Sequence, residues 1–346
     1  MSREIGSEFW DVPAGDNTGE GNRLFPEGTA WYLSGRTALG AVLADIRRRG
    51  LACGSAALPV WCCGSMAEPF LRAGIRVEFY PVWFDGRLRQ EPRTDCDLLL
   101  VMDYFGAAGP APELRGYRGT VIRDETHSLF SARRDDAAYT FGSLRKWCGV
   151  WTGGFARAKD GGALPADSMK NEGAERYVSL RREAMERKRA YLAGRGRKDY
   201  LALFGEAEAL LDTAEGMAQA DPRDRELAGR LDARRIREKR RENAEVLRAG
   251  LREWLMFPDM GEADCPLFVP VLVPGEKRDA LRQALTSQEI YCPVHWPAAD
   301  GLRPDARVRA ILGSELSLVC DQRYTPEDME RILDVIQTFR KEASLC

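Results

Sequence analysis

The sequence has few histidines and no regular cysteine spacing. Its 346 residues include only two histidines, and its nine cysteines form no C-x-x-C pair. Because a structural zinc site needs about four closely spaced Cys or His ligands, we expect no metal. The irregular cysteine spacing also gives no indication of a disulfide framework.

The sequence also has almost no net charge and no long apolar run. Its 51 basic and 53 acidic residues give a net charge of −2, so no overall field favours nucleic acid or an anionic membrane. No stretch approaches the roughly 20 apolar residues of a membrane-spanning helix, and the first residues lack the apolar core of a signal peptide. We therefore expect a cytoplasmic protein with no nucleic-acid and no membrane partner. A nucleic-acid binder that uses helices within 176–241 is a poor alternative.

Short apolar runs alternate with helical segments in the first half of the chain. This alternation predicts an α/β fold with a mainly parallel central sheet flanked by helices. The run at 97–106 is nearly all apolar, which is typical of a strand buried on both faces. The five predicted strand segments are 56–61, 76–83, 97–106, 120–124 and 153–158.

The character of the sequence changes near residue 165. Charged helical sequence predicts a helical insert over about 165–230, and we interpret its basic stretch, 176–198, as a charged helix face rather than a diphosphate site. A long helix over 231–255 leads to a second α/β unit. We therefore expect an N-terminal segment with a large domain over 1–245 and a small domain over 246–346.

Four local patterns could carry chemistry. In Ser34-Gly35-Arg36-Thr37, a glycine turn opens a predicted helix, which favours a phosphate site; a simple N-cap is the alternative. Asp124 ends a predicted strand, where ligands bind in open α/β sheets, and a carboxylate there can hold a protonated ring nitrogen. An N-cap or a surface turn stays open for Asp124.

The other two patterns follow Asp124 in the chain. His127 could hydrogen-bond a phenolate-type oxygen or pack on a ring face, and a purely structural role stays open. Ser143-x-x-Lys146 lies between aromatic and glycine-rich flanks. A lysine in such surroundings can form a Schiff base, and the serine could bond a nearby phosphate.

In this order, the patterns resemble those of fold-type I pyridoxal phosphate (PLP) enzymes, above all the DegT/DnrJ/EryC1/StrS family of sugar aminotransferases. The resemblance extends from about residue 30 to 340. The matching stretches are YLSGRTAL, LPVWCCGSMAEPFLRAG with VEFYPV, VMDYFG, RDETH, SLRKW…TGG, VHWP and YTPEDMERILDVI.

The resemblance implies a PLP cofactor and a role for each matching residue. Lys146 would carry PLP as a Schiff base, Asp124 would pair with the pyridine nitrogen, and His127 matches the family's Gln or His three residues after that Asp. The phosphate would be held by the backbone N–H groups of Gly35 and Arg36 and by Ser143.

Two parts of the site are less well defined by the resemblance. The family places an aromatic residue over the PLP ring near the position of Cys62 and Cys63, with Trp61 adjacent. In the second domain, His295 could contact substrate or be a packed loop residue. Arg323 could bind a donor carboxylate, or it could be a solvated side chain or serve the start of a helix.

The resemblance implies an aminotransferase that moves an amino group from an amino acid to a keto-sugar, which we expect to be nucleotide-linked. Its context would be polysaccharide biosynthesis, and the enzyme would be a homodimer. Alternatives are another fold-type I enzyme acting on an amino acid, a dehydratase-like relative, and a non-catalytic relative that only binds. Dehydratase relatives usually replace the lysine with His, so Lys146 argues against them.

Overall fold

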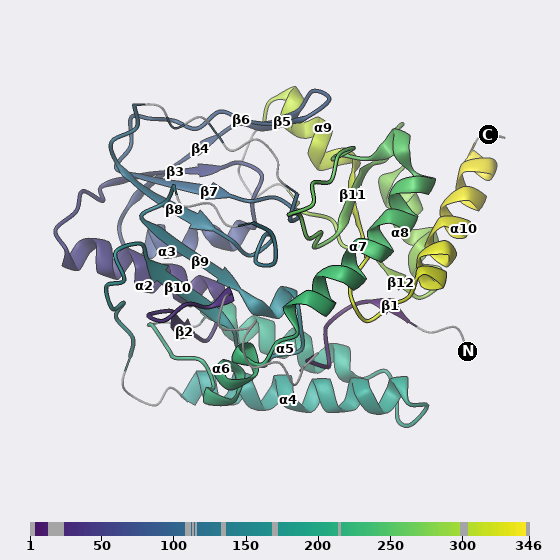
Figure 1. Ribbon diagram of the computed structural model, residues 1–346, viewed down its shortest axis with the longest axis horizontal. Coiled ribbons are helices and arrows are strands. Elements are labelled where there is room, and N and C mark those ends of the chain that lie inside the picture. Colours follow the sequence, from purple (N-terminus) through teal and green to yellow (C-terminus); the bar gives the residue numbers. More distant parts are fainter. Residues whose placement is uncertain are drawn as a thin grey trace.

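The computed structural model describes residues 4–12, 24–107, 112, 114, 116–132, 136–167, 172–213, 216–297 and 304–343. A seven-stranded sheet forms the centre of its N-terminal half (Figure 1). In spatial order the strands are β2 (Ala30–Tyr32), β10 (Gly154–Ala158), β9 (Tyr139–Ser143), β8 (Thr120–Asp124), β7 (Leu98–Met102), β3 (Ser55–Pro59) and β4 (Arg76–Tyr80).

The sheet is parallel apart from one strand. From β9 to β4, neighbouring strands run parallel, whereas β10 is antiparallel to both β2 and β9. The carboxyl ends of β2, β8 and β9 therefore meet the amino end of β10 at one edge of the sheet. The predicted mainly parallel α/β sheet is confirmed, and β7 is buried along its whole length as expected.

Helix α2 (Gly35–Arg48) covers one side of this sheet and packs on β9 and β10. Its N-cap is Ser34, whose side chain accepts the N–H of Thr37. The N-cap alternative from the sequence is therefore correct for Ser34. A short 3-10 turn (Gly64–Met66) and α3 (Glu68–Arg72) connect β3 to β4. The hairpin of β5 (Val82–Phe84) and β6 (Leu88–Gln90) lies at the top of Figure 1, beside α9 (Ala306–Ser314).

The C-terminal part forms a second core, on the right of Figure 1. Two small sheets pair β11 (Val269–Leu272) with β13 (Glu315–Leu318), and β1 (Ile5–Gly6) with β12 (Ile290–Tyr291). The helices around them are α7 (Ala233–Gly250), α8 (Arg278–Ser287) and α10 (Pro326–Ala343), with a 3-10 turn at Arg252–Trp254. Ile5 of β1 belongs to this core, so the chain's first described strand packs with its last elements. The domain division at residue 245 stays a prediction.

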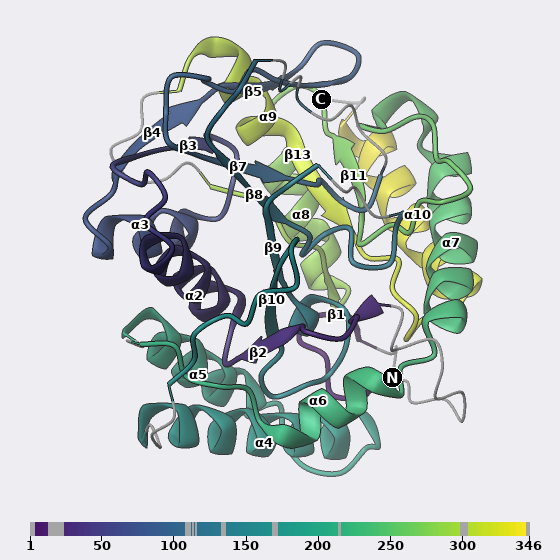
Figure 2. The same cartoon turned by 60° about the vertical axis from the view of Figure 1, so that its left-hand side comes forward.

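The helical insert comprises α4 (Glu172–Leu192), α5 (Tyr200–Thr213) and α6 (Pro222–Gly229). Figures 1 and 2 show α4 and α5 side by side below β2 and β10. The interpretation of 176–198 as a charged surface face is wrong for Arg181 and Lys188, because both side chains are 0% exposed and both pair with acids. Lys188 reaches Glu4 of the N-terminal segment, at 3.0 Å between Nζ and Oε1.

No helix within the described residues combines the length and the apolar character needed to cross a membrane.

Candidate active site

The edge of the sheet where β8 and β9 end brings three predicted site residues together. Asp124 is the last residue of β8 and pairs in register with Phe141 of β9. Ser143 ends β9, and Lys146 follows in a single 3-10 turn, Leu144–Lys146. Because β8 and β9 are parallel neighbours, the residues that follow them emerge on the same side.

The start of α2 lies against Ser143. A Cβ placed on Gly35 would lie 3.4 Å from the Ser143 Cβ and 3.4 Å from the Gly142 carbonyl oxygen. The backbone is close here as well, since a Cβ on Gly154 would lie 2.0 Å from the Ser34 oxygen. The turn before α2 therefore meets the ends of β9 and β10 with almost no room for added side chains.

This junction has the donors that a phosphate needs. The first N–H groups of a helix have no partner within the helix, and Ser34 accepts only that of Thr37. The N–H groups of Gly35 and Arg36 are thus available at the positive end of the helix dipole. Beside them, the buried Ser143 hydroxyl has no hydrogen-bond partner among the described residues. A buried polar atom left without a partner is costly, and a phosphate oxygen would satisfy it.

The side chain of Arg36 points away from this junction. Its guanidinium donates to Glu68 and Asp212 at 3.1 Å each, and to the Leu211 carbonyl at 3.1 Å. Only the backbone of Arg36 is therefore placed for a phosphate, which is the group that the sequence interpretation assigned.

Asp124 is a buried carboxylate with few partners. Its side chain is 4% exposed, and Oδ1 accepts the Thr126 N–H at 2.8 Å. Burial raises the pKa of Asp124 to about 6, although the Thr126 hydrogen bonds oppose the shift. A cation placed against this carboxylate would remove the cost of its buried charge. A protonated ring nitrogen is such a cation.

His127 is held as a neutral ring. Its Nδ1 accepts the backbone N–H of Phe105 at 3.3 Å, so the ring proton lies on Nε2. Burial, reinforced by the charge of Lys146, lowers the pKa of His127 to about 3. The ring therefore offers an uncharged N–H donor, which suits an oxygen acceptor such as a phenolate.

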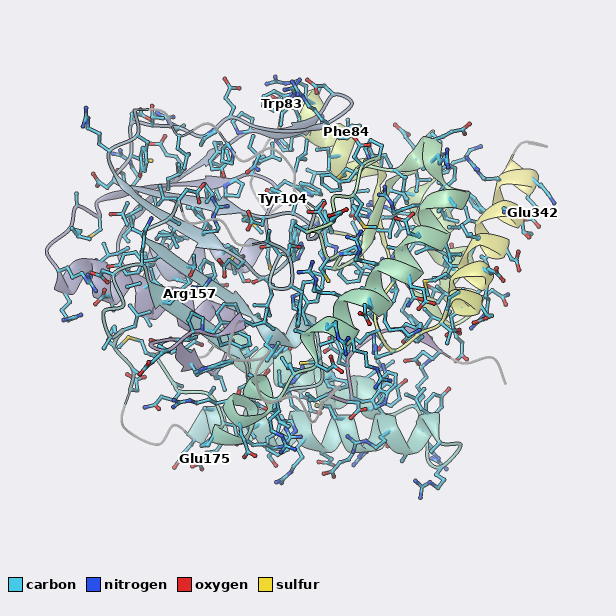
Figure 3. The ribbon with its side chains drawn as sticks, viewed as in Figure 1. Trp83, Phe84, Tyr104, Arg157, Glu175 and Glu342 are labelled. Carbon is cyan, nitrogen blue, oxygen red and sulfur yellow. The ribbon has the colours of Figure 1, made fainter. Side chains whose placement is uncertain are left out.

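Aromatic rings gather beside His127. Trp61 stacks on Tyr104, with centroids 4.8 Å apart and planes 11° apart, and Trp296 stacks on His127 at 5.3 Å. Figure 3 labels Tyr104 at the side of the sheet that faces the C-terminal half. Trp61 is fully buried in this cluster, and its Nε1 donates to the His295 carbonyl at 2.6 Å.

The two cysteines after Trp61 have different surroundings. Cys62 is buried, and its thiol pKa is raised by burial, then by Cys63 and by the charge of Asp124. Cys63 is partly exposed and lies 3.0 Å from the Ser65 hydroxyl, measured from Sγ to Oγ. Cys62 is thus the member of the pair whose thiol is affected by the charge of Asp124, the carboxylate of the predicted ring site.

Lys146 lines a cavity of about 390 Å³ between the end of β9, the N-terminal segment and the C-terminal unit. The lysine side chain is exposed. Its charge acts on His127 and on His295, which also lines the cavity. The sheet edge with Asp124 and Ser143 therefore has an adjoining space in which a substrate could meet the lysine.

One side of the cavity comes from the helical insert and was not found from the sequence. Arg145 donates to the Tyr177 hydroxyl of α4 at 2.8 Å and to the Glu208 carboxylate of α5. Arg181 lies 3.4 Å from carboxylate oxygens of both Glu8 and Glu208. Both acids line the cavity. No local sequence signal identifies Glu8 and Glu208, because each of their ion pairs joins segments that lie far apart in the chain.

Another arginine missed from the sequence supports the turn that carries Lys146. The Arg240 guanidinium lies 4.4 Å over the ring of Trp147 and donates to Gln322 at 2.7 Å and to the Leu267 carbonyl at 2.9 Å. Its buried Nη2 has no hydrogen-bond partner among the described residues.

Arg323 reaches the cavity as part of an ion pair. Its Nε and Nη2 each lie 2.8 Å from an oxygen of Asp321, and Nη1 and Nη2 donate to the carbonyls of Glu8 and Ser7. The guanidinium also lies 3.9 Å over the Phe9 ring. These contacts tie the N-terminal segment to the C-terminal unit, and donor binding by Arg323 stays a prediction.

By sequence, the chain matches no family model and no curated protein. By structure, it is similar over nearly its whole length to solved aminotransferases. PseC of Helicobacter pylori, an aminotransferase involved in the biosynthesis of pseudoaminic acid, has a TM-score of 0.63 at 15% identity, covering 97% of this chain and 100% of PseC.

Two further solved structures are similar. A DegT DnrJ EryC1 StrS aminotransferase from Brucella abortus has a TM-score of 0.57 at 16% identity, with 90% and 85% of the two chains covered. The PLP form of Spr1654 from Streptococcus pneumoniae has a TM-score of 0.59 at 13% identity, with 96% and 93% covered. At such identities the likeness defines the fold, so the chain has the fold-type I architecture that the family resemblance implied.

Proposed function

We propose that the chain is a PLP-dependent aminotransferase that transfers an amino group from an amino acid to a nucleotide-linked keto-sugar. One observation supports this most directly. Asp124, Ser143 and Lys146 leave two parallel strands at one edge, against the start of α2, in the fold of solved aminotransferases. A cytoplasmic location and a role in polysaccharide synthesis belong to the same proposal.

The residues at this edge fit PLP. Lys146 would be its point of attachment, and Asp124 would face the ring nitrogen. Ser143 and the N–H groups of Gly35 and Arg36 would hold the phosphate. The orphaned Ser143 hydroxyl and the buried carboxylate of Asp124 are the two features that the cofactor would satisfy.

When bound, PLP supplies an electron sink for the electrons released at the substrate's α-carbon. The protein groups have separate tasks. Lys146 moves the proton at that carbon as general base and then as general acid. Asp124 keeps a proton on the ring nitrogen, since a carboxylate beside it favours the charged form. His127 donates an uncharged N–H to an oxygen of the ring.

The test begins with cofactor attachment. We expect the purified protein to develop a visible absorption band with PLP. Borohydride should bleach the band and leave the label on the peptide that contains Lys146. Lys146→Ala should lose the label and all turnover. Lys239→Ala, which changes a partly exposed lysine paired with Glu242, should behave as wild type.

A second variant tests the phosphate site separately. Ser143→Ala should weaken PLP affinity by about tenfold, the effect expected from the loss of one charge-assisted hydrogen bond, and leave the unfolding free energy nearly unchanged.

Full turnover by Lys146→Ala would contradict the proposal. A screen of amino acids and nucleotide-linked keto-sugars would then identify the donor and the acceptor.

A further inference from the structure

The rings of the two histidines of this chain lie against each other, and His295 lines the cavity. His127 follows β8, and His295 lies in the C-terminal unit, yet their ring centroids are 5.4 Å apart with planes at 81°. The charge of Lys146 acts on both rings. A chain with only two histidines therefore places both beside the same lysine.

The His295 ring is the end of a hydrogen-bonded chain. Its Nδ1 lies 2.7 Å from the Ser317 hydroxyl oxygen, which lies 2.5 Å from Oε1 of Glu315. The other oxygen of Glu315 accepts the backbone N–H of His295 at 2.7 Å. Ser317 and Glu315 belong to β13 and are 0% exposed. The ring and the carboxyl group are therefore connected through one buried hydroxyl.

No basic side chain forms an ion pair with Glu315 within the described part of the chain. Arg278, whose charge acts on Glu315, donates to the Glu315 carbonyl at 3.1 Å rather than to the carboxyl group. The Cys292 thiol is the other titratable neighbour on this side. His127 and Lys146 act on the ring at the far end. Burial raises the pKa of Glu315 to about 8, although the hydrogen bonds from Ser317 and His295 oppose the shift.

We propose that Glu315 and Ser317 are positioning residues that set the tautomer of His295, so that a protonated Glu315 gives His295 an N–H donor at Nε2 for a substrate oxygen, and an ionised Glu315 turns that nitrogen into an acceptor. The part of this inference that concerns substrate rests on the proposed function. The tautomer itself does not.

The direction of the hydrogen bonds between Glu315, Ser317 and His295 follows from which of their atoms can donate a proton. An ionised Glu315 can only accept, so Ser317 donates to it and must accept from His295, which places the ring proton on Nδ1. A protonated Glu315 donates to Ser317, whose own proton then goes to Nδ1 of His295, and the ring proton lies on Nε2. Protons shift along the chain, but the imidazole stays neutral in both states.

At neutral pH, the two histidines then act alike. His127 already carries its proton on Nε2, because Nδ1 accepts from Phe105. With Glu315 protonated, His295 does the same, so two uncharged N–H donors stand beside Lys146. Such a pair suits oxygens that accept hydrogen bonds, such as a carbonyl or a carboxylate. It adds no positive charge near the amine.

Nitrogen NMR reads the tautomers directly. Protein labelled with ¹⁵N in histidine gives signals from only two rings, and protonated and unprotonated ring nitrogens are well separated. For wild type we expect His295 to be protonated on Nε2 at pH 6.5 and on Nδ1 at pH 9.5, with a midpoint near pH 8. His127 should stay protonated on Nε2 throughout.

Two variants break the chain at different points. Glu315→Gln replaces the acid by a permanently neutral amide that can still donate to Ser317, so His295 should keep its proton on Nε2 at every pH. Ser317→Ala disconnects the ring and should abolish the transition. Ser314→Ala, an exposed serine bonded to Ala310 of its own helix, should titrate as wild type.

Kinetics tests the role in recognition. The donor for this test is the best one from a panel of the twenty amino acids. Between pH 7 and pH 9, the ratio of the wild-type KM to the Glu315→Gln KM should rise by about fivefold, the effect expected from the loss of one hydrogen bond. The ratio of the two kcat values should change little. A wild-type ring that never changes tautomer overturns the inference. A tautomer change with a constant KM ratio overturns its substrate part.

Failure of the proposed function has a separate signature. Wild-type protein without a PLP band would refute the aminotransferase, whereas the NMR titration would still decide the tautomer chain.

Discussion

At the scale of single residues, Asp124 is the buried carboxylate that most clearly needs a positively charged partner. Its pKa of about 6 lies above the ordinary Asp value of 3.8 because the carboxyl is buried. The native protein therefore binds this proton more tightly than the unfolded chain. The free energy of unfolding that this bound proton contributes is fully present below about pH 4, and it is lost as the pH rises through 6. At neutral pH the loss is about 3 kcal/mol, from about 1.4 kcal/mol per pKa unit.

This leads to a prediction for cofactor-free protein. Asp124→Asn keeps an oxygen for the Thr126 N–H but carries no charge. Its unfolding free energy at pH 7.5 should exceed that of wild type by up to about 3 kcal/mol, and the two should agree near pH 4. Urea unfolding at both pH values measures the difference.

Asp85→Asn is the matched control, because this exposed carboxylate pairs with Arg89 and should change stability by less than about 1 kcal/mol. A variant at Asp124 that is less stable at pH 7.5 would show that the buried charge is not the dominant cost. With PLP added, the order should reverse, since the ring nitrogen would then stabilise only the aspartate.

At the scale of elements, α4 joins the N-terminal segment to the rest of the molecule. Lys188 of α4 is 0% exposed, lies 3.0 Å from Glu4 and donates to the Glu8 carbonyl at 2.7 Å. Lys198 lies 2.8 Å from the same glutamate and 3.2 Å from Glu289. These ion pairs, of which Lys188–Glu4 is fully buried, hold the strand β1 that completes the second core.

We expect Lys188→Met to lower the unfolding free energy by about 3 kcal/mol, because Glu4 stays buried with one cation fewer. The neighbouring Arg187 is a strict comparison. It lies on the exposed face of α4 and pairs with Glu183 and Asp199, so Arg187→Gln should cost less than about 1 kcal/mol. Equal effects from the two variants would show that the burial of Lys188 does not matter.

At the scale of the whole molecule, the cavity joins four separate parts of the chain. Lys146 comes from the sheet, Glu208 from the insert, Glu8 from the N-terminal segment and His295 from the C-terminal unit. A substrate in this space would touch all four parts. Residues remote from Lys146 in sequence should therefore affect substrate affinity as strongly as its neighbours do.

The family resemblance also predicts a homodimer. Light scattering coupled to size exclusion should then give twice the 38.7 kDa of one chain, with no change on tenfold dilution. A stable mass of 38.7 kDa would refute the dimer without affecting the assignment of Lys146.

Local order along the chain was predictable, with instructive exceptions. The segment 120–124 was predicted as a strand and is β8, because an apolar run bounded by turn residues is a local signal. The strand β9, Tyr139–Ser143, was not identified, although all of its residues are buried. Gly142 weakens its strand signal, and the reason for this glycine is tertiary. A Cβ there would lie 2.6 Å from the Phe155 ring.

The sequence by itself determined the α/β architecture and the chain order of the phosphate turn, Asp124 and Lys146, since periodicity, caps and strand ends depend on near neighbours. Only the tertiary structure decided that His127 meets His295 and that the insert supplies Glu208. It also decided that Arg323 pairs with Asp321. Such contacts depend on how distant elements pack, and no residue's local surroundings encode the partner that packing brings to it.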